Sequence, residues 1–275
     1  MSSKKINMSN AITNSNVLLK LFCSLTIVVL ICILIGKYAF KNGLLTCDHY
    51  IFNTYLYVIL SILLIFIIVL INDQTGIFNS FLLLFTTSNT LIILILLLII
   101  LLLLVYALQK VNPANIFASN MIWLLLILVL GITVIPVIWF GRLTNIVGLA
   151  GAITILTTLV VGVAGYYYGD KIITFDWDKY LQYALYFLIF AAFIGIFFIS
   201  PKNIYTYFFV ISIISLVIFA LMLLSNHKKI KENADKCIDG QVVPNYPLES
   251  FGIFIKMLNI FLNLIRILGR RYRKY

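Results

Sequence analysis

Polar side chains recur at regular intervals along the last hydrophobic segment of the chain. They are Lys256, Asn259, Asn263, Arg266 and Arg270, at spacings of 3, 4, 3 and 4. This spacing places all of them on one face of an α-helix. Such a basic amphipathic helix can lie in the membrane interface, or it can insert among other helices with its polar face toward a wet interior. Periodicity alone favours the interface.

The groups that catalysis or cation transport would need are missing from the hydrophobic segments. All nine Asp and Glu residues lie in connections, whereas a cation pathway uses intramembrane carboxylates or aimed carbonyls. The two histidines, His49 and His227, stand at segment ends, where we expect solvated side chains. HExxH, GxSxG and P-loop patterns do not occur in the sequence. The sequence therefore predicts a protein that is not an enzyme and uses no cofactor or metal.

The composition requires a lipid environment. The 275 residues are 63% hydrophobic and 11% charged, where a soluble domain carries about a quarter charged residues. One water-soluble core of this size cannot hide so much apolar surface. The net charge of +11 comes mainly from the termini and the connections, which indicates an anionic membrane surface as partner and not nucleic acid.

Eight hydrophobic segments follow one another along the chain. A helix needs roughly 20 apolar residues to cross about 30 Å of hydrocarbon, and the segments are 17–40, 51–72, 81–108, 121–140, 146–168, 181–200, 204–225 and 251–268. None shows the period-2 alternation of a barrel strand, so we expect helices. The sequence predicts an all-α, polytopic transmembrane helical bundle of about seven to eight hydrophobic helices. It forms a single domain over 17–269, between a polar N-terminal tail (1–16) and a basic C-terminal tail (270–275).

Basic residues at three places predict the orientation of the bundle. The N-terminal tail, the polar connection 226–249 and the C-terminal tail all carry Lys or Arg, and the positive-inside rule places each of them in the cytosol. That arrangement requires an even number of crossings before Asn226 and a last segment that does not cross completely. Either one early segment does not span, or one of the three assignments is wrong.

The fifth segment, 146–168, is rich in small residues. Gly148, Gly151 and Ala152 predict close packing against a neighbouring helix, because small side chains let two helices approach in lipid. Its threonines, among them Thr154 and Thr158, either support the same packing or line a polar cavity. Packing is the favoured interpretation.

Three stretches of the C-terminal half resemble a known family. They are AITILTTLVVGVAGYYYGDKIITFDWDKY at 152–180, the segment 204–225 with the polar NHKKIKENADKC after it, and YPLESFGIFIKMLNIFLNLIRILG at 246–269. They are similar to the Gly/Thr-rich helix and the last two helices of the Bax-inhibitor family, also called the transmembrane Bax-inhibitor-motif or lifeguard-like family. The first 140 residues match that family only as apolar helices.

The resemblance implies a bundle in the endoplasmic reticulum, the Golgi or another intracellular membrane. The family is associated with suppression of cell death and with a pH-sensitive calcium leak, attributed to an aspartate pair near the ends of the last two helices. This sequence has Asn226 and Lys256 at those two positions. Two carboxylates that could share a proton or a cation become an amide and a fixed positive charge. We expect a Bax-inhibitor-like scaffold without the acidic gate.

Lys256 should then point into the bundle, toward Ser225 and Asn226, because a lysine at the centre of a lipid-facing helix costs about 2.5–3.5 kcal/mol. The predicted function is modulation of cell death and/or intracellular calcium homeostasis, with a lost or altered aspartate-gated leak. Its partners would be the lipid bilayer and membrane proteins of cell-death control, without nucleic acid. The alternative is an unrelated small transporter or channel-like protein that conducts through threonine and backbone groups.

Overall fold

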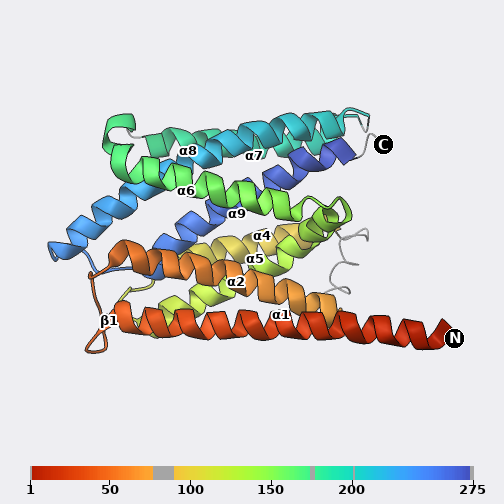
Figure 1. Cartoon of the computed structure of the whole chain (residues 1–275). Helices are drawn as coiled ribbons and strands as arrows, with labels where there is room; N and C mark the ends of the chain where they lie inside the picture. Colours follow the sequence, from red (N-terminus) through yellow and green to blue (C-terminus); the bar gives the residue numbers. More distant parts are fainter. Residues whose placement is uncertain (1, 77–89, 174–176, 201, 273–275) are drawn as a thin grey trace. The chain divides into compact units, whose positions relative to one another are not determined.

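The computed structural model describes residues 2–76, 90–173, 177–200 and 202–272, and the side chains of 18–76, 95–173, 177–195, 198–200 and 202–269. Eight helices lie in these ranges (Figure 1). They are α1 (Ser2–Tyr38), α2 (Tyr50–Thr75), α4 (Thr90–Lys110), α5 (Ile116–Leu143), α6 (Val147–Ile172), α7 (Trp177–Phe198), α8 (Ile204–Ile238) and α9 (Tyr246–Tyr272). Part of the third predicted segment, 81–89, and the last residues of the C-terminal tail, 273–275, lie outside the described residues.

The eight helices correspond to the eight hydrophobic segments, which confirms the predicted all-α bundle. The largest difference is in α8, which continues beyond its apolar part to Ile238. The stretch expected to be a polar connection is therefore mostly helix, and only 239–245 joins α8 to α9. Its Lys, Glu and Ala residues favour helix, and Lys228 and Glu232 form an i,i+4 ion pair at 3.8 Å.

Helix length and exposed apolar surface both indicate a membrane protein. Among the described residues, six helices are long and apolar enough to cross a bilayer; they are α1 from Leu18, α2, α5, α6, α8 and α9 up to Gly269. Large apolar side chains also cover their outer surfaces, as with Leu103 on α4 and Phe187 on α7, which are 62% and 73% exposed. Only lipid can cover apolar surface of this extent. The chain is an integral, multi-pass membrane protein.

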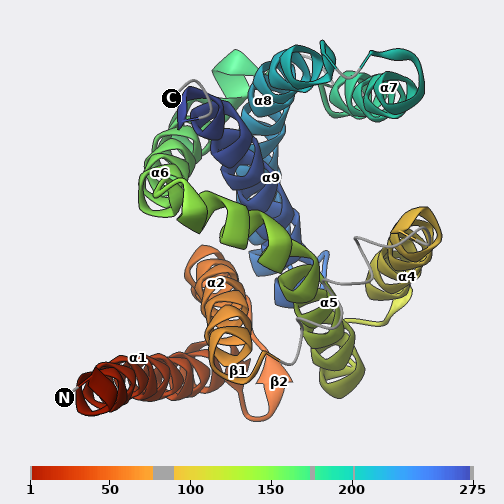
Figure 2. The ribbon, with the colours of Figure 1, turned by 90° about the vertical axis from the view of Figure 1, so that its right-hand side faces the viewer.

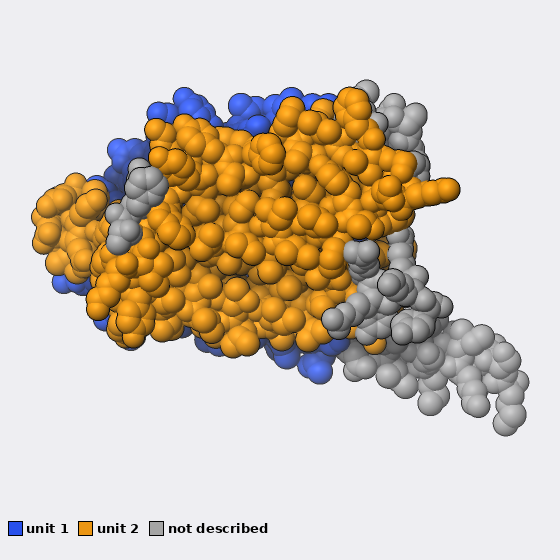
Figure 3. Space-filling model, turned by 90° about the horizontal axis from the view of Figure 1, so that it is seen from above, with its two compact units in different colours: residues 1–136, 243–250 blue, residues 137–242, 251–275 orange. Residues whose placement is uncertain are grey.

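The chain divides into two compact units (Figure 3). Unit 1 consists of Met1–Pro136 and Val243–Ser250, and unit 2 of Val137–Val242 and Phe251–Tyr275. Two helices contribute to both units. The boundary falls at Pro136 within α5, which continues through this proline, and after Ser250 within the first turns of α9.

In unit 1, α1 packs against α2, and a short hairpin connects them. Its strands are β1 (Phe40–Lys41) and β2 (Leu44–Leu45), which pair antiparallel. Asn42 and Gly43 form the turn with φ angles of 53° and 79°. Positive φ at both turn residues is what a two-residue hairpin requires, and Asn-Gly is the pair that adopts it most readily.

Tyr246, the first residue of α9, is the largest fully buried side chain of the protein's described part. Its hydroxyl donates a hydrogen bond to the carbonyl oxygen of Thr46 and accepts one from Asn53 Nδ2 at 3.4 Å. Its ring centroid lies 5.3 Å from that of Tyr50. These contacts join the start of α9 to α2 and to the connection that follows the hairpin.

In unit 2, α8 packs against both α6 and α7, and Figure 2 shows α8 between these two helices. The α6 face that is buried consists of small residues, namely Ala150, Thr154, Thr158, Gly162, Gly165 and Gly169. A Cβ atom added to Gly165 would lie 2.7 Å from the Leu224 carbonyl oxygen, and one added to Gly169 would lie 3.0 Å from Lys228 Cβ. Glycine therefore permits the close approach of α6 and α8.

The expectation that Gly148, Gly151 and Ala152 make this contact is wrong. Gly148 and Ala152 are exposed, and no atom lies within 4 Å of a Cβ built at Gly148 or Gly151. Small residues occur all round α6, so composition alone could not identify the packed face. Packing itself, the favoured interpretation, is correct. The hydroxyls of Thr154 and Thr158 donate to carbonyls of their own helix at 2.8 Å, which satisfies them without a cavity.

Candidate functional site

Helix α9 carries the predicted polar face and lies among the helices of unit 2. On its apolar side Ile253, Ile260 and Ile265 are fully buried. A Cβ on Gly141 of α5 would lie 3.3 Å from Ile265 Cδ1, so α9 packs closely there. The expectation that this helix lies flat in the membrane interface is wrong. The same periodicity serves both arrangements, and the hydrogen-bond partners that α8 offers to the polar face favour insertion.

Lys256 and Asn226 form a direct contact between α9 and α8. Lys256 Nζ donates to Asn226 Oδ1 at 3.0 Å and to the carbonyl oxygen of Gly252 at 3.0 Å. Gly252 makes room for this contact, since a Cβ there would lie 2.8 Å from Asn226 Nδ2. The predicted inward orientation of Lys256 and its hydrogen bond to Asn226 are confirmed. The two positions that hold aspartates in the resembling family are thus joined here by an ammonium–amide hydrogen bond.

The remaining residues of the polar face behave differently from one another. Asn263 is buried and donates through Nδ2 to Ser215 Oγ on α8 at 2.9 Å. Asn259, half-buried, donates to the carbonyl oxygen of Ile255 at 2.7 Å. Arg266 is exposed, and the side chain of Arg270 lies outside the described residues. Two of the predicted residues, Lys256 and Asn263, therefore face α8.

A carboxylate that the sequence placed in a connection completes the cluster. Asp178, in the first turn of α7, accepts hydrogen bonds from Ser225 Oγ and from Lys229 Nζ on α8. Ser225 was expected to accept a hydrogen bond from Lys256; it donates to Asp178 instead. Because Ser225 and Asn226 are adjacent, the α7–α8 contact and the α8–α9 contact meet at one place. We call Asp178, Ser225, Asn226, Lys229 and Lys256 the polar cluster.

The electrostatics of the polar cluster are those of a compensated charge. Asp178 precedes the apolar part of α7 and so lies outside the membrane-spanning segments. Burial by itself raises the pKa of this carboxyl group, but the hydrogen bonds from Lys229 and Ser225 and the charges of Lys229 and Lys256 hold its pKa below its ordinary value. Asp178 is therefore ionised at neutral pH and compensates the nearby ammonium groups.

Further ion pairs surround the same end of α6 and α8. Lys228 donates to the carbonyl oxygen of Ile173 at 3.0 Å, at the C-terminal end of α6, where a cation complements the helix dipole. Asp170 lies 3.7 Å from Lys228 and 3.4 Å from Lys231. His227 was expected to be solvated, but it is only 4% exposed; His49 is exposed as expected. The burial of His227 depends on the close approach of α6, which periodicity could not reveal.

Protonation of Asp178 should weaken the fold. Since its folded pKa is lowered, the carboxylate stabilises the protein at pH values above about 3.9, and this stabilisation is lost as the pH falls through the folded pKa. Asp178→Asn should therefore lower the melting temperature in detergent at pH 7, with a difference from wild type that shrinks toward pH 3. The control is Asp170→Asn, whose carboxylate is 65% exposed and should matter little at either pH. A difference that stays constant from pH 7 to pH 3 would contradict a role for the charge.

The structure also separates two basic segments that were expected on one side of the membrane. Lys228–Lys236 extends from the end of α8 that contacts Gly252 and Lys256, whereas Arg270 follows at the far end of α9. Helix α9 is long and apolar enough to cross the bilayer up to Gly269. An incomplete last crossing is therefore not supported, and the two segments lie at opposite ends of a spanning helix.

Glycosylation acceptor sites can test this separation. One site placed in the connection 239–245 and another appended after Tyr275, in separate variants, should give opposite results, with one site modified and the other not. An acceptor site in the short hairpin at Asn42–Gly43 serves as a reference for a connection of known position between α1 and α2. If neither or both of the first two sites were modified, α9 would not cross the membrane.

The sequence missed Asp178 as a member of the polar cluster. One signal was available, because an acidic residue in the first turn of a helix, as here in α7, interacts favourably with the helix dipole. That signal identifies a helix start. It does not identify Ser225 and Lys229 as partners, which lie 47 and 51 residues further along the chain.

Comparison with known protein families agrees with the resemblance of the C-terminal stretches. The family model described as "Inhibitor of apoptosis-promoting Bax1" matches residues 47–273. The match begins before α2 and runs into the end of the chain, so it includes helices that resembled the family only by their apolar composition. Comparison with individual curated proteins finds no match. Because the family model covers most of the chain and the chain forms a multi-pass helical bundle, this protein belongs to the Bax inhibitor family.

Proposed function

We propose that this protein modulates cell death and/or intracellular calcium homeostasis from within a membrane, and that its aspartate-gated leak is lost or altered. The observation that carries the proposal is the hydrogen bond of 3.0 Å between Lys256 Nζ and Asn226 Oδ1. These residues occupy the two positions that the resemblance assigns to the gating aspartates.

The chemistry of this pair is unlike that of two carboxylates. An ammonium group repels Ca²⁺ electrostatically, and it takes up the acceptor oxygens that a hard cation would need as ligands. Neither an amide nor a lysine ammonium at its ordinary pKa titrates between pH 6 and pH 8. A leak through this end of the bundle should therefore be weak and insensitive to pH in that range.

A calcium-flux assay tests the proposal. Wild-type protein in liposomes should leak Ca²⁺ poorly, with little change between pH 6 and pH 8. The double variant Asn226→Asp/Lys256→Asp restores both carboxylates and should produce a larger, pH-dependent flux, because two close carboxylates share a proton and one of them titrates at raised pH.

The control is Lys256→Met, which removes the positive charge without adding an acid and should not produce pH dependence. Circular dichroism and melting temperature should show that all three proteins are folded. A strong proton-gated calcium leak from the wild type would contradict the proposal, as would a double variant that stays as tight as wild type.

The location and partners follow from family membership. We propose residence in the endoplasmic reticulum, the Golgi or another intracellular membrane, where a fluorescent fusion should coincide with markers of those compartments. Within that membrane, we propose that the protein acts through contacts with the bilayer and with membrane proteins of cell-death control, without enzymatic activity and without nucleic acid. Fusion protein found mainly at the plasma membrane would contradict the proposed location.

A further inference from the structure

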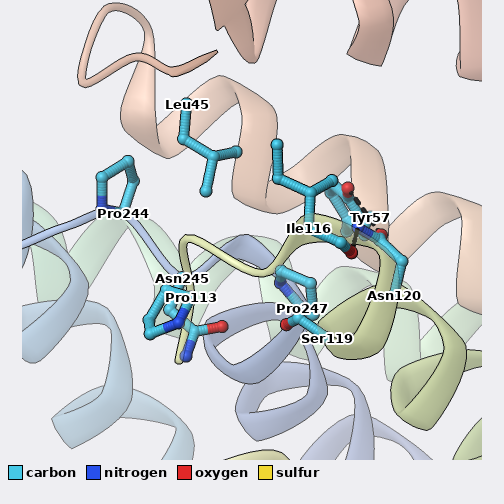
Figure 4. A pocket seen from close by; sticks show the side chains of 9 residues that line it. All are labelled: Leu45, Tyr57, Pro113, Ile116, Ser119, Asn120, Pro244, Asn245 and Pro247. Carbon is cyan, nitrogen blue, oxygen red and sulfur yellow. Dashed lines mark hydrogen bonds between the residues drawn. The ribbon is translucent and has the colours of Figure 1, made fainter. Parts of the chain in front are cut away.

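Unit 1 contains a pocket whose polar groups belong to no site described above (Figure 4). Residues of α2, of the start of α5 and of the start of α9 line it. Three of these lining residues are prolines, Pro113, Pro244 and Pro247. Proline fixes its own φ angle and offers no backbone N–H, so these walls are stiff and lack donors. The polar side chains of the pocket must therefore come from the helices.

Ser119 is the polar side chain that the pocket leaves unexplained. It lies on α5, lines the pocket and is 2% exposed, and its hydroxyl has no hydrogen-bond partner among the described protein atoms. One turn further along α5, the indole N–H of Trp123 is a second buried donor without a partner. Buried polar groups in native proteins are almost always hydrogen-bonded, to protein or to ordered water. Each of these groups therefore calls for an acceptor.

Tyr57 lies next to both of these groups. Its hydroxyl donates to Asn120 Oδ1 at 2.9 Å, the bond drawn in Figure 4, and its ring centroid lies 5.3 Å from that of Trp123. Because the Tyr57 hydroxyl uses its proton toward Asn120, its oxygen remains able to accept a hydrogen bond. The pocket thus presents one hydroxyl that lacks any partner and one oxygen that can still accept.

The size of the pocket limits what can fill it. Its empty volume is about 200 Å³, including the part that is open to solvent. Pockets for drug-sized ligands usually measure about 300–1,000 Å³, whereas one water occupies about 30 Å³ of the liquid and needs two to four polar partners. The dimensions and the polar groups both match a few water molecules.

We propose that this pocket binds ordered water, and that one such water accepts a hydrogen bond from Ser119 Oγ and donates one to the oxygen of Tyr57. The water joins α5 to α2 beside the start of α9, where no direct hydrogen bond links Ser119 to another described residue. It supplies the partner that this buried hydroxyl lacks.

Opposite shifts in melting temperature test this proposal. Ser119→Ala removes a hydroxyl that is bonded to water, so the melting temperature in detergent should fall by about 2–4 °C. The control is Ser212→Ala on α8. Ser212 is 0% exposed, its hydroxyl is likewise without a partner among the described atoms, and it does not line the pocket. Removing an unsatisfied hydroxyl from a dry site should leave the melting temperature unchanged or raise it.

A double-mutant cycle tests the shared water. If one water bridges both groups, Tyr57→Phe already breaks the bridge, and adding Ser119→Ala should then cost much less than it does in the wild type. All four proteins should fold, since each change deletes one oxygen atom. A rise in melting temperature for Ser119→Ala, as for Ser212→Ala, would overturn the proposal. Additive shifts for Ser119→Ala and Tyr57→Phe would overturn it too.

Discussion

Gly165→Leu should destabilise the protein severely. A Cβ atom at this position would lie 2.7 Å from the Leu224 carbonyl oxygen and 2.8 Å from His227 Cβ. The carbonyl belongs to the backbone of α8, so it cannot move aside as a flexible side chain would, and α6 and α8 must separate. Overpacking typically costs 1–3 kcal/mol and occasionally more. With a whole leucine to accommodate, we expect a loss of about 3 kcal/mol or more, visible as a large drop in melting temperature in detergent.

The matched control is Gly151→Leu on the same helix. No atom lies within 4 Å of a Cβ built at Gly151, so the added side chain has open space, and leucine also has a higher helix propensity than glycine. The melting temperature of Gly151→Leu should stay close to that of wild type or rise. Equal losses for Gly165→Leu and Gly151→Leu would contradict the packing described for α6 and α8.

The same contact bears on the proposed gate. Leu224 and His227 flank Ser225 and Asn226, so separation of α6 from α8 should disturb the polar cluster as well as the fold. Gly165→Leu protein that survives in liposomes should therefore show a changed calcium flux, whereas Gly151→Leu should match wild type.

Tyr246→Ala should be the most damaging substitution in unit 1. The side chain is 0% exposed and fills the space beside Tyr50 and Tyr57, whose ring centroids lie 5.3 Å and 6.2 Å away. Truncation of a buried aromatic residue to alanine typically costs 3–5 kcal/mol through lost burial and the cavity that remains. For a protein of this size, that corresponds to a fall in melting temperature of roughly 6–20 °C.

Two variants separate the ring of Tyr246 from its hydroxyl and from its chemical type. Tyr246→Phe keeps the ring and loses only the hydrogen bonds with Thr46 and Asn53, so its loss should be about 1–3 kcal/mol. Tyr183→Ala on α7 removes a tyrosine that is 56% exposed and should change the melting temperature little. A loss for Tyr246→Ala no larger than that for Tyr183→Ala would contradict the role of Tyr246 as the anchor of α9.

The helices and their membrane setting could be predicted from the sequence because both depend on local composition. A stretch of about 20 apolar residues must satisfy its own backbone hydrogen bonds in lipid, and only a helix does so within one segment. The meeting of Lys256 with Asn226 was also predictable. The cost of a lysine in lipid requires a polar partner, and the resemblance placed Asn226 opposite it. The hairpin turn at Asn42–Gly43 carried a strong local signal of its own.

Other features depended on which surfaces meet, and only the tertiary structure decided them. Periodicity showed that Lys256, Asn259, Asn263 and Arg266 share one side of α9, but a helix in the interface and a helix inserted among others have the same periodicity. The partners on α8, Asn226 and Ser215, decide between them. On α6, glycines occur on every face, and the approach of α8 selects Gly165 in place of Gly151. Asp178 joins the polar cluster through Ser225 and Lys229, because hydrogen bonds between helices depend on distances in space that no spacing along the chain specifies.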